Sequence, residues 1–171
     1  LRIMGYSVYD TDSEAKRLME SSLEVVQKLS ECFGRDIYHN GRLNRGLLSS
    51  RVFGESDKIV LLNSIVHPVV RFDFYRWSES LNEEICFVES AILYESRFDE
   101  LVDEVWTVTA PEELRIGRVR QRSGLTEEEI KKRMAAQLSE EEKQRRAAHI
   151  IWNDGNVSVI HRVLSLLKSL E

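Results

Sequence analysis

The chain has 171 residues and a formal net charge of −5 at pH 7, a length that suits one medium-sized domain able to bury its own core. The acidic balance argues against nucleic-acid binding through bulk charge, and no apolar run is long enough to span a membrane. Cys32 and Cys86 lie in apolar stretches outside any metal-binding pattern, so we expect reduced core cysteines in a cytoplasmic protein that is a monomer or a small homo-oligomer.

The first residues read as the end of a helix. Gly5 is the residue type that terminates helices in a left-handed conformation, and residues 6–10 then read as a strand. Because a single isolated helical turn is unstable, we expect further residues upstream, including a strand beside 6–10.

The remaining elements alternate between helices and short apolar strands. Asn40 and Gly41 mark a turn within the turn-rich stretch 34–41. Pro68 disfavours helical geometry in the residue before it, which places a helix boundary at His67. The predicted helices cover about 12–33, 44–53, 56–66, 69–81, 112–122, 126–138, 140–147 and 157–170, and the later strands cover 85–88, 105–108 and 149–152.

These later strands are short, largely apolar runs, which is typical of strands buried on both faces of a parallel sheet. The pattern predicts an α/β fold, with helices flanking a parallel sheet and an all-helical insertion in the middle of the chain. Ligands of such sheets bind at the carboxyl ends of the strands, so residues directly after strands are the first candidates for function.

Asp10 and Asp12 occupy such a position, at the end of strand 6–10. One reading is that Asp12 or Ser13 caps the following helix. Another is that the two carboxylates hold a metal ion or a substrate hydroxyl. The residues alone leave both readings open.

Other polar residues follow the predicted strands or share helix faces. His67 and Arg71 lie one turn apart and could meet a phosphate, although a His-Pro pair by itself usually marks a boundary. The loop containing Tyr94 and Glu95 is either a cover over a substrate or packing. Pairs spaced by four also occur at Arg118 and Arg122 and at Arg133 and Gln137, and Asn153-Asp154-Gly155 forms a turn after the last strand.

Two readings of the arginine pairs remain. They are either surface partners of nearby glutamates or groups delivered to a transferring phosphoryl by mobile helices, for which the planar guanidinium is well suited.

In their joint order these segments resemble the dephospho-coenzyme A kinase family. The resemblance rests on Asp10-Thr11-Asp12 followed by Ala15-Lys16, His67-Pro68, Ile92-Leu93-Tyr94-Glu95, Arg118 with Arg122, Arg133 with Gln137, Lys143, and the run from Ala148 to Gly155. Three departures stand out: Ala91 replaces the usual proline, His149 replaces the usual aspartate, and the family's phosphate-binding glycine-rich loop is not in this sequence.

The resemblance implies a P-loop NTPase-like fold and ATP-dependent phosphorylation of the ribose 3′-hydroxyl of dephospho-coenzyme A, with Mg²⁺ required. It divides the chain into a core (1–33, 83–122 and 148–171), a substrate-binding helical insertion (about 34–82) and a lid (about 123–147).

The same resemblance implies residue roles. Asp12 is the base and Asp10 holds Mg²⁺ through water, while Arg133 and Gln137 belong to the lid. Nucleotide contacts fall to Arg118, Arg122, Asn153 and Gly155, and acceptor contacts to Lys16, His67, Arg71, Tyr94 and Glu95. The alternatives are another small-metabolite P-loop kinase and a non-catalytic nucleotide-binding protein.

Overall fold

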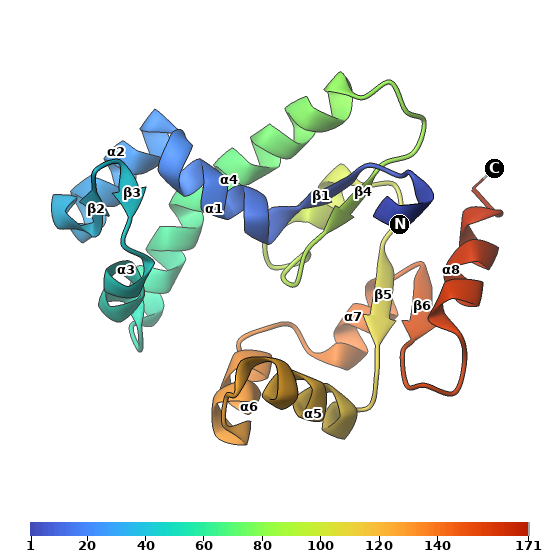
Figure 1. Cartoon of the computed structure of the whole chain (residues 1–171). Helices are drawn as coiled ribbons and strands as arrows, with labels where there is room; N and C mark the ends of the chain where they lie inside the picture. The colour runs from blue at the N-terminus through green and yellow to red at the C-terminus, as the bar shows by residue number, and fades with distance from the viewer. Residues whose placement is uncertain (171) are drawn as a thin grey trace. The chain divides into compact units, whose positions relative to one another are not determined.

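A computed structural model describes residues 1–170 and divides the chain into two compact units, Leu1–Ala91 and Ile92–Glu171. Figure 1 labels the helices and strands of each unit. We describe the two units separately.

The first unit contains a pair of parallel strands, β1 (Val8–Asp10) and β4 (Phe87–Glu89), in which Asp10 lies opposite Glu89. A short 3₁₀ helix, η1 (Arg2–Met4), precedes β1 and ends at Gly5, whose φ of 92° is left-handed. The predicted helix end at Gly5 and the predicted strand after it are therefore both confirmed.

The helical stretch predicted over 12–33 is two helices, α1 (Thr11–Ser21) and α2 (Leu23–Phe33). Ser22 interrupts them because its backbone is extended, and its hydroxyl accepts a hydrogen bond from the amide of Val25. This arrangement is a serine N-cap, which satisfies one free amide at the start of α2.

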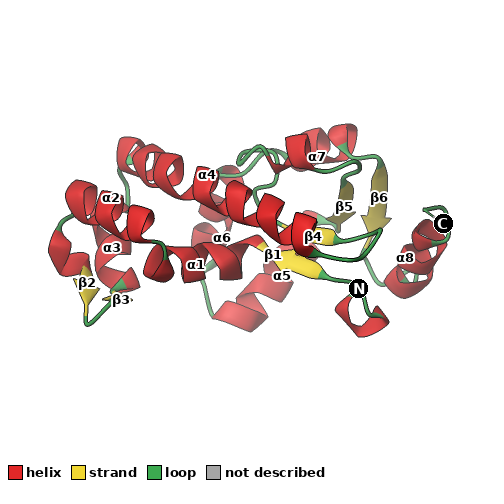
Figure 2. Ribbon diagram, turned by 90° about the horizontal axis from the view of Figure 1, so that it is seen from above, coloured by secondary structure: helices red, strands yellow, loops and turns green. Residues whose placement is uncertain are grey.

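The two helices predicted on either side of Pro68 are one helix, α4 (Ser56–Ser80). The predicted boundary at His67 is therefore wrong. Pro68 lies on the exposed side of α4, where the carbonyl it leaves unbonded can face water, while Ile65, Val66 and Val70 are buried on the packed side. In Figure 2 this helix runs beside α1, against which it packs.

A small hairpin precedes α4. The 3₁₀ helix η2 (Arg35–Ile37) leads into β2 (Tyr38–His39) and β3 (Arg42–Leu43), followed by α3 (Arg45–Val52). Asn40 and Gly41 both have positive φ, 49° and 75°, as the tight hairpin turn requires. The turn was predicted, whereas its two-residue strands were not.

The core of the first unit lies between β1 and helices α1, α2 and α4. Its buried members include Tyr9, Val25, Leu29 and Phe74. Cys32 lies on α2 but is exposed, and Cys86 is only partly buried, so the prediction that both are core residues is wrong. Neither forms a disulfide.

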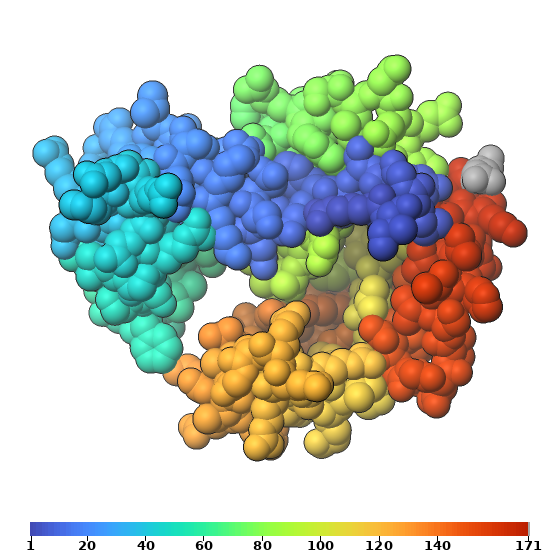
Figure 3. Space-filling view, in the orientation of Figure 1, coloured from blue at the N-terminus to red at the C-terminus, as the bar shows by residue number. Residues whose placement is uncertain are grey.

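The second unit contains another parallel pair, β5 (Trp106–Thr109) and β6 (His149–Trp152). The 3₁₀ helix η3 (Phe98–Leu101) precedes β5, and α8 (Val159–Leu167) follows β6 and packs on it. Helices α5 (Glu112–Ser123), α6 (Glu127–Ala135) and α7 (Glu140–Arg146) connect the two strands. In Figure 3, α5 and α6 form the yellow-to-orange lobe of this unit.

The predicted α/β class, with parallel strands flanked by helices, is confirmed. The described strands form two parallel pairs and one antiparallel hairpin, and β1 is hydrogen-bonded to β4 alone. Among the residues that the structure describes, no helix has the length and apolar character needed to cross a membrane.

Candidate functional site

Asp10 is both the last residue of β1 and the N-cap of α1. Its carboxylate accepts hydrogen bonds from the amide of Ser13 at 3.0 Å and from the Ser13 hydroxyl at 3.1 Å. The amide bond in particular holds the pKa of Asp10 below its usual range. The expectation that Asp12 or Ser13 caps the helix is therefore wrong, because α1 begins earlier than predicted, at Thr11.

Thr11 fixes the first turn of α1 to the neighbouring strand. Its side chain is buried, and its hydroxyl donates a hydrogen bond to the backbone carbonyl of Glu89 at 3.0 Å. Thr11 was not among the predicted site residues, although a hydroxyl between two aspartates was a usable signal.

Asp12 stands next to this anchor in the first turn of α1 and is exposed. Because Asp10 does the capping, the Asp12 carboxylate accepts no hydrogen bond from a backbone amide in the described part of the chain. Lys16 lies one turn further along and is exposed as well. The backbone that carries the carboxylate is thus anchored, and the carboxylate itself remains open to solvent.

His67 and Arg71 lie four residues apart on α4, as predicted, and therefore share a face of that helix. His67 is half-buried, and this burial lowers its pKa, so the neutral imidazole is favoured near neutral pH. α4 packs on α1, the helix that carries Asp12 and Lys16.

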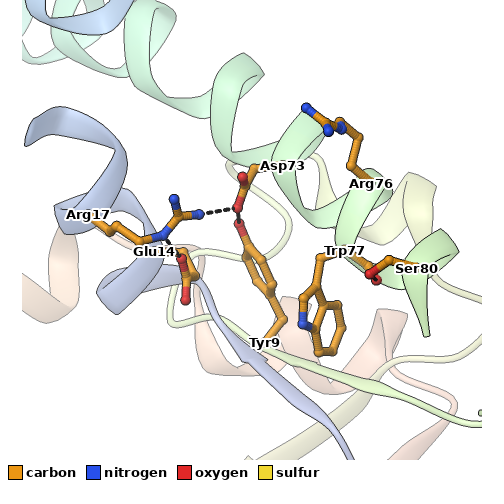
Figure 4. Close-up of a pocket in the computed structure, with 7 residues that line it drawn as sticks. All are labelled: Tyr9, Glu14, Arg17, Asp73, Arg76, Trp77 and Ser80. Atoms are coloured by element: carbon orange, nitrogen blue, oxygen red, sulfur yellow. Dashed lines mark hydrogen bonds and ion pairs between the residues drawn. The ribbon is translucent and has the colours of Figure 1, made fainter. Parts of the chain in front are cut away.

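An open pocket of about 410 Å³ lies between α1, β1 and α4 (Figure 4). Inside it, Asp73 accepts hydrogen bonds from the Tyr9 hydroxyl and from Arg17, both at 2.7 Å, and Arg17 also pairs with Glu14. None of the predicted site residues lines this pocket. Most of the charged side chains in this pocket are paired with one another. We therefore interpret them as contacts that hold α1, β1 and α4 together.

In the second unit, the structure brings Arg118 and Asn153 together. Arg118 of α5 donates a hydrogen bond to the backbone carbonyl of Asn153 at 2.7 Å. The amide of Asn153 in turn donates to the carbonyl of Thr109, at the end of β5, and Gly155 follows with a φ of 91°. Arg122 lies on the same face of α5, four residues after Arg118, and is exposed.

Tyr94 and Glu95 contact the segment around α7. The Arg146 guanidinium lies over the Tyr94 ring, 5.3 Å from its centre, and the buried Tyr94 hydroxyl has no hydrogen-bond partner among residues 1–170. Burial raises the pKa of Tyr94. The Glu95 carboxylate accepts a hydrogen bond from the backbone amide of Leu138 at 2.6 Å.

Arg133 and Gln137 do not share a helix face. α6 ends at Ala135, two residues earlier than the pairing requires, and Gln137 follows in a turn. Arg133 is exposed, whereas the Gln137 side chain accepts a hydrogen bond from Lys143 at 3.0 Å. The predicted common face is therefore wrong, because the helix ends before Gln137.

Parallel strands followed by helices, a solvent-facing carboxylate at the end of a strand, and arginines on a helical pair are typical of small-molecule kinases with a P-loop fold. The model of the dephospho-CoA kinase family matches residues 1–158. The chain belongs to the dephospho-CoA kinase family.

Individual relatives agree with this assignment. The dephospho-CoA kinases of Bacteroides fragilis and Porphyromonas gingivalis are 36% and 35% identical to this chain over 99% of its length, covering 83% and 85% of their own. The crystal structure of TT1252 from Thermus thermophilus superimposes with a TM-score of 0.85 at 33% identity, covering 98% of this chain and 86% of that one.

The structure of a dephospho-CoA kinase from Campylobacter jejuni shares the fold, with a TM-score of 0.70 at 23% identity. The match covers 99% of this chain and 89% of the Campylobacter jejuni chain. The family's reaction, ATP-dependent phosphorylation of dephospho-coenzyme A, is the last step of coenzyme A biosynthesis.

Proposed function

We propose that this chain transfers the γ-phosphoryl group of ATP to the ribose 3′-hydroxyl of dephospho-coenzyme A, with Asp12 as the base. The proposal rests on the different positions of two carboxylates, those of Asp10 and Asp12. Asp10 accepts a hydrogen bond from a backbone amide at the start of α1, which leaves the Asp12 carboxylate open to a substrate hydroxyl on an anchored turn.

Asp12 orients the 3′-hydroxyl and accepts its proton as the new P–O bond forms. A carboxylate is too weak a base to remove that proton beforehand, so proton transfer comes late in the reaction. The bond between the γ-phosphorus and the bridging oxygen breaks, and ADP leaves. The two anchors of the turn, Asp10 and Thr11, hold the backbone that carries this carboxylate while the reaction proceeds.

The residues present fit a magnesium ion held through water. Mg²⁺ keeps several waters and binds one or two carboxylates together with substrate phosphates. Each Asp10 oxygen accepts one hydrogen bond from Ser13 and keeps a second lone pair for a metal-bound water. Within the described residues no cluster of three or more metal-ligating side chains exists, which agrees with a site shared with nucleotide phosphates. When bound, Mg²⁺ neutralises phosphate charge.

Nucleotide binding falls to the Arg118–Asn153 pair. The hydrogen bond from Arg118 to the Asn153 carbonyl holds the guanidinium beside the turn that ends at Gly155. A planar cation and a glycine-containing turn together suit the face and the edge of an adenine ring. Arg122, exposed on the same helix face, suits a phosphate oxygen.

On the acceptor side we assign Lys16, His67 and Arg71 to the phosphates and ribose of dephospho-coenzyme A, and Tyr94 to its cover. The helical segment of about 34–82 is the acceptor-binding insertion, and the lid lies within the segment of about 123–147, from which Arg133 reaches the phosphates. Two cysteines that form no disulfide in the described structure are consistent with a cytoplasmic enzyme, acting as a monomer or small homo-oligomer.

The proposal is tested with the protein as its gene encodes it. Purified protein is incubated with ATP, with and without Mg²⁺, and with dephospho-coenzyme A, adenosine or shikimate as acceptor. Formation of coenzyme A phosphorylated at the 3′ position, dependent on Mg²⁺ and absent with the other acceptors, supports the proposal. Equal phosphorylation of another acceptor, or phosphate on any other hydroxyl, contradicts it.

A further inference from the structure

The loop that carries Glu95 is a rigid platform. The amide and hydroxyl of Ser96 both donate to the carbonyl of Ile92, at 2.9 and 2.6 Å, and the amide of Phe98 donates to the carbonyl of Leu93 at 2.9 Å. Ser96 and Phe98 are buried, with only 2% of Phe98 exposed. The backbone around Glu95 therefore has little freedom, although the Glu95 side chain itself reaches outward.

From this platform Glu95 contacts a single backbone amide far along the chain. Its carboxylate accepts from the amide of Leu138 at 2.6 Å, across 43 residues of sequence. A bond between an amide and an ionised carboxylate is among the stronger protein hydrogen bonds. Leu138 stands between the end of α6 and Ser139, the N-cap of α7.

On the C-terminal side of Leu138, helix α7 is hydrogen-bonded to strand β5. The Gln144 side chain donates to the Thr109 hydroxyl, and the Thr107 hydroxyl donates to the Lys143 carbonyl. Glu140 also pairs with Arg115 of α5 at 2.5 Å. α7 therefore belongs to the body of the unit, although it falls within the segment 123–147 that the sequence assigns to the lid.

On the N-terminal side of Leu138, helix α6 is less firmly held. It packs on α5, Ile130 is its one buried residue, and its cations Lys131, Lys132 and Arg133 are all exposed. The change from a solvated helix to an anchored one thus takes place over the few residues that Glu95 holds.

We propose that Glu95 is a positioning residue for phosphoryl transfer: its carboxylate fixes the hinge at Leu138 and so determines where α6 presents Arg133. This assignment rests on the proposed function of α6 as part of a lid. It replaces the expected role of Glu95 as a direct substrate ligand, because the carboxylate already holds the chain's own backbone.

The test compares Glu95→Ala and Glu95→Gln with the wild type and with a matched control. Ala removes the acceptor, whereas Gln keeps an uncharged acceptor oxygen of the same reach. The control is Asp103→Asn, which neutralises an exposed acid eight residues later. The two measurements are hydrogen exchange of the Leu138 amide without substrates, and kcat and KM for ATP and dephospho-coenzyme A.

Glu95→Ala is expected to speed exchange of the Leu138 amide at least about tenfold and to lower kcat at least about tenfold, while both KM values change less than about threefold. Glu95→Gln is expected to fall between Ala and wild type. Asp103→Asn is expected to stay within about twofold of wild type in both measurements.

Unchanged Leu138 exchange in Glu95→Ala overturns the inference, as does unchanged kcat. A rise in the KM for dephospho-coenzyme A with kcat preserved also overturns it, because Glu95 would then be a substrate ligand. If the Ala variant does not fold, Glu95→Gln decides by the same readouts. Failure of the wild type to phosphorylate dephospho-coenzyme A refutes the proposed function instead, and the exchange measurement still decides whether Glu95 holds the hinge.

Discussion

The hydrogen bond between Tyr9 and Asp73 is the most direct link between the strand that leads to the candidate catalytic turn and helix α4. Tyr9 is 3% exposed, and its hydroxyl donates to the Asp73 carboxylate at 2.7 Å. Asp73 also holds Arg17 of α1. Tyr9→Phe removes this one hydroxyl and keeps the ring that packs on Phe74 and Trp77.

The expected loss in the free energy of unfolding follows from the hydrogen bonds that each variant removes. A hydrogen bond to a charged acceptor contributes about 1.5–3 kcal/mol, and the part of Asp73 open to water reduces this to about 1–2 kcal/mol. Asp73 is not orphaned in the variant, because Arg17 still donates to it. Asp73→Ala is expected to cost more, because the buried Tyr9 hydroxyl is then left with only the Val70 carbonyl at 3.4 Å.

Urea denaturation measures both variants, with Tyr75→Phe as the control, since Tyr75 lies on α4 but is 54% exposed. The control should remain within about 0.5 kcal/mol of wild type. In the double variant of Tyr9→Phe and Asp73→Ala the losses should not add, because both remove the same bond. A loss below about 0.3 kcal/mol for Tyr9→Phe, or simple additivity, would refute the reasoning.

Two further predictions follow from the site and its surroundings. Burial raises the pKa of Tyr38 to about 12, and its hydroxyl donates to the Met19 carbonyl at 2.6 Å. Between about pH 10 and 12 the folded state therefore keeps a proton that the unfolded state loses, so the free energy of unfolding should fall as the pH rises. Tyr38→Phe should make that fall shallower in urea denaturation measured from about pH 9 to 11, and an unchanged slope would count against it. Arg118→Ala should raise the KM for ATP at least about tenfold through loss of a fixed guanidinium, while Arg120→Ala, on an exposed position of the same helix, should change it less than about twofold. Equal KM values for the two variants would show that Arg118 does not bind nucleotide.

The positions of the parallel strands could be read from the sequence, because β4, β5 and β6 are short, largely apolar runs with polar residues after them. This placed Asp10 and Asp12 at a strand end and Asn153 after the last strand, and the structure agrees. The predicted capping residue was wrong because capping depends on where the helix begins. The sequence indicates that position only to within a residue or two. Beginning α1 at Thr11 gives the capping role to Asp10.

The continuity of α4 through Pro68 could not be predicted from local rules. A proline costs a helix one hydrogen bond, and only the packing of residues such as Val66 and Val70 against the rest of the unit offsets that loss. Similarly, nothing local in the sequence relates Glu95 to Leu138 or Tyr9 to Asp73. These pairs are 43 and 64 residues apart, and they meet because the fold brings distant elements together.

The end of α6 could not be predicted from local spacing either. Spacing by four suggested that Arg133 and Gln137 share a face, which holds only while the helix lasts. The helix ends at Ala135, and Gln137 instead pairs with Lys143 of the next helix. Arg118 and Arg122 do keep their common face, because α5 continues to Ser123 before Gly124 ends it.

The assignment of Asp12 as the base is tested most directly by Asp12→Asn in the protein as its gene encodes it. Asparagine keeps the size and exposure of the side chain but cannot accept the hydroxyl proton. The account predicts that kcat falls at least about a hundredfold, the usual scale for loss of a general base, with an unchanged free energy of unfolding. Glu14→Gln, on the opposite side of α1 beside Arg17, is the matched control and should keep kcat within about threefold. Near-normal kcat in Asp12→Asn would contradict the central claim and leave Asp12 without a part in the chemistry.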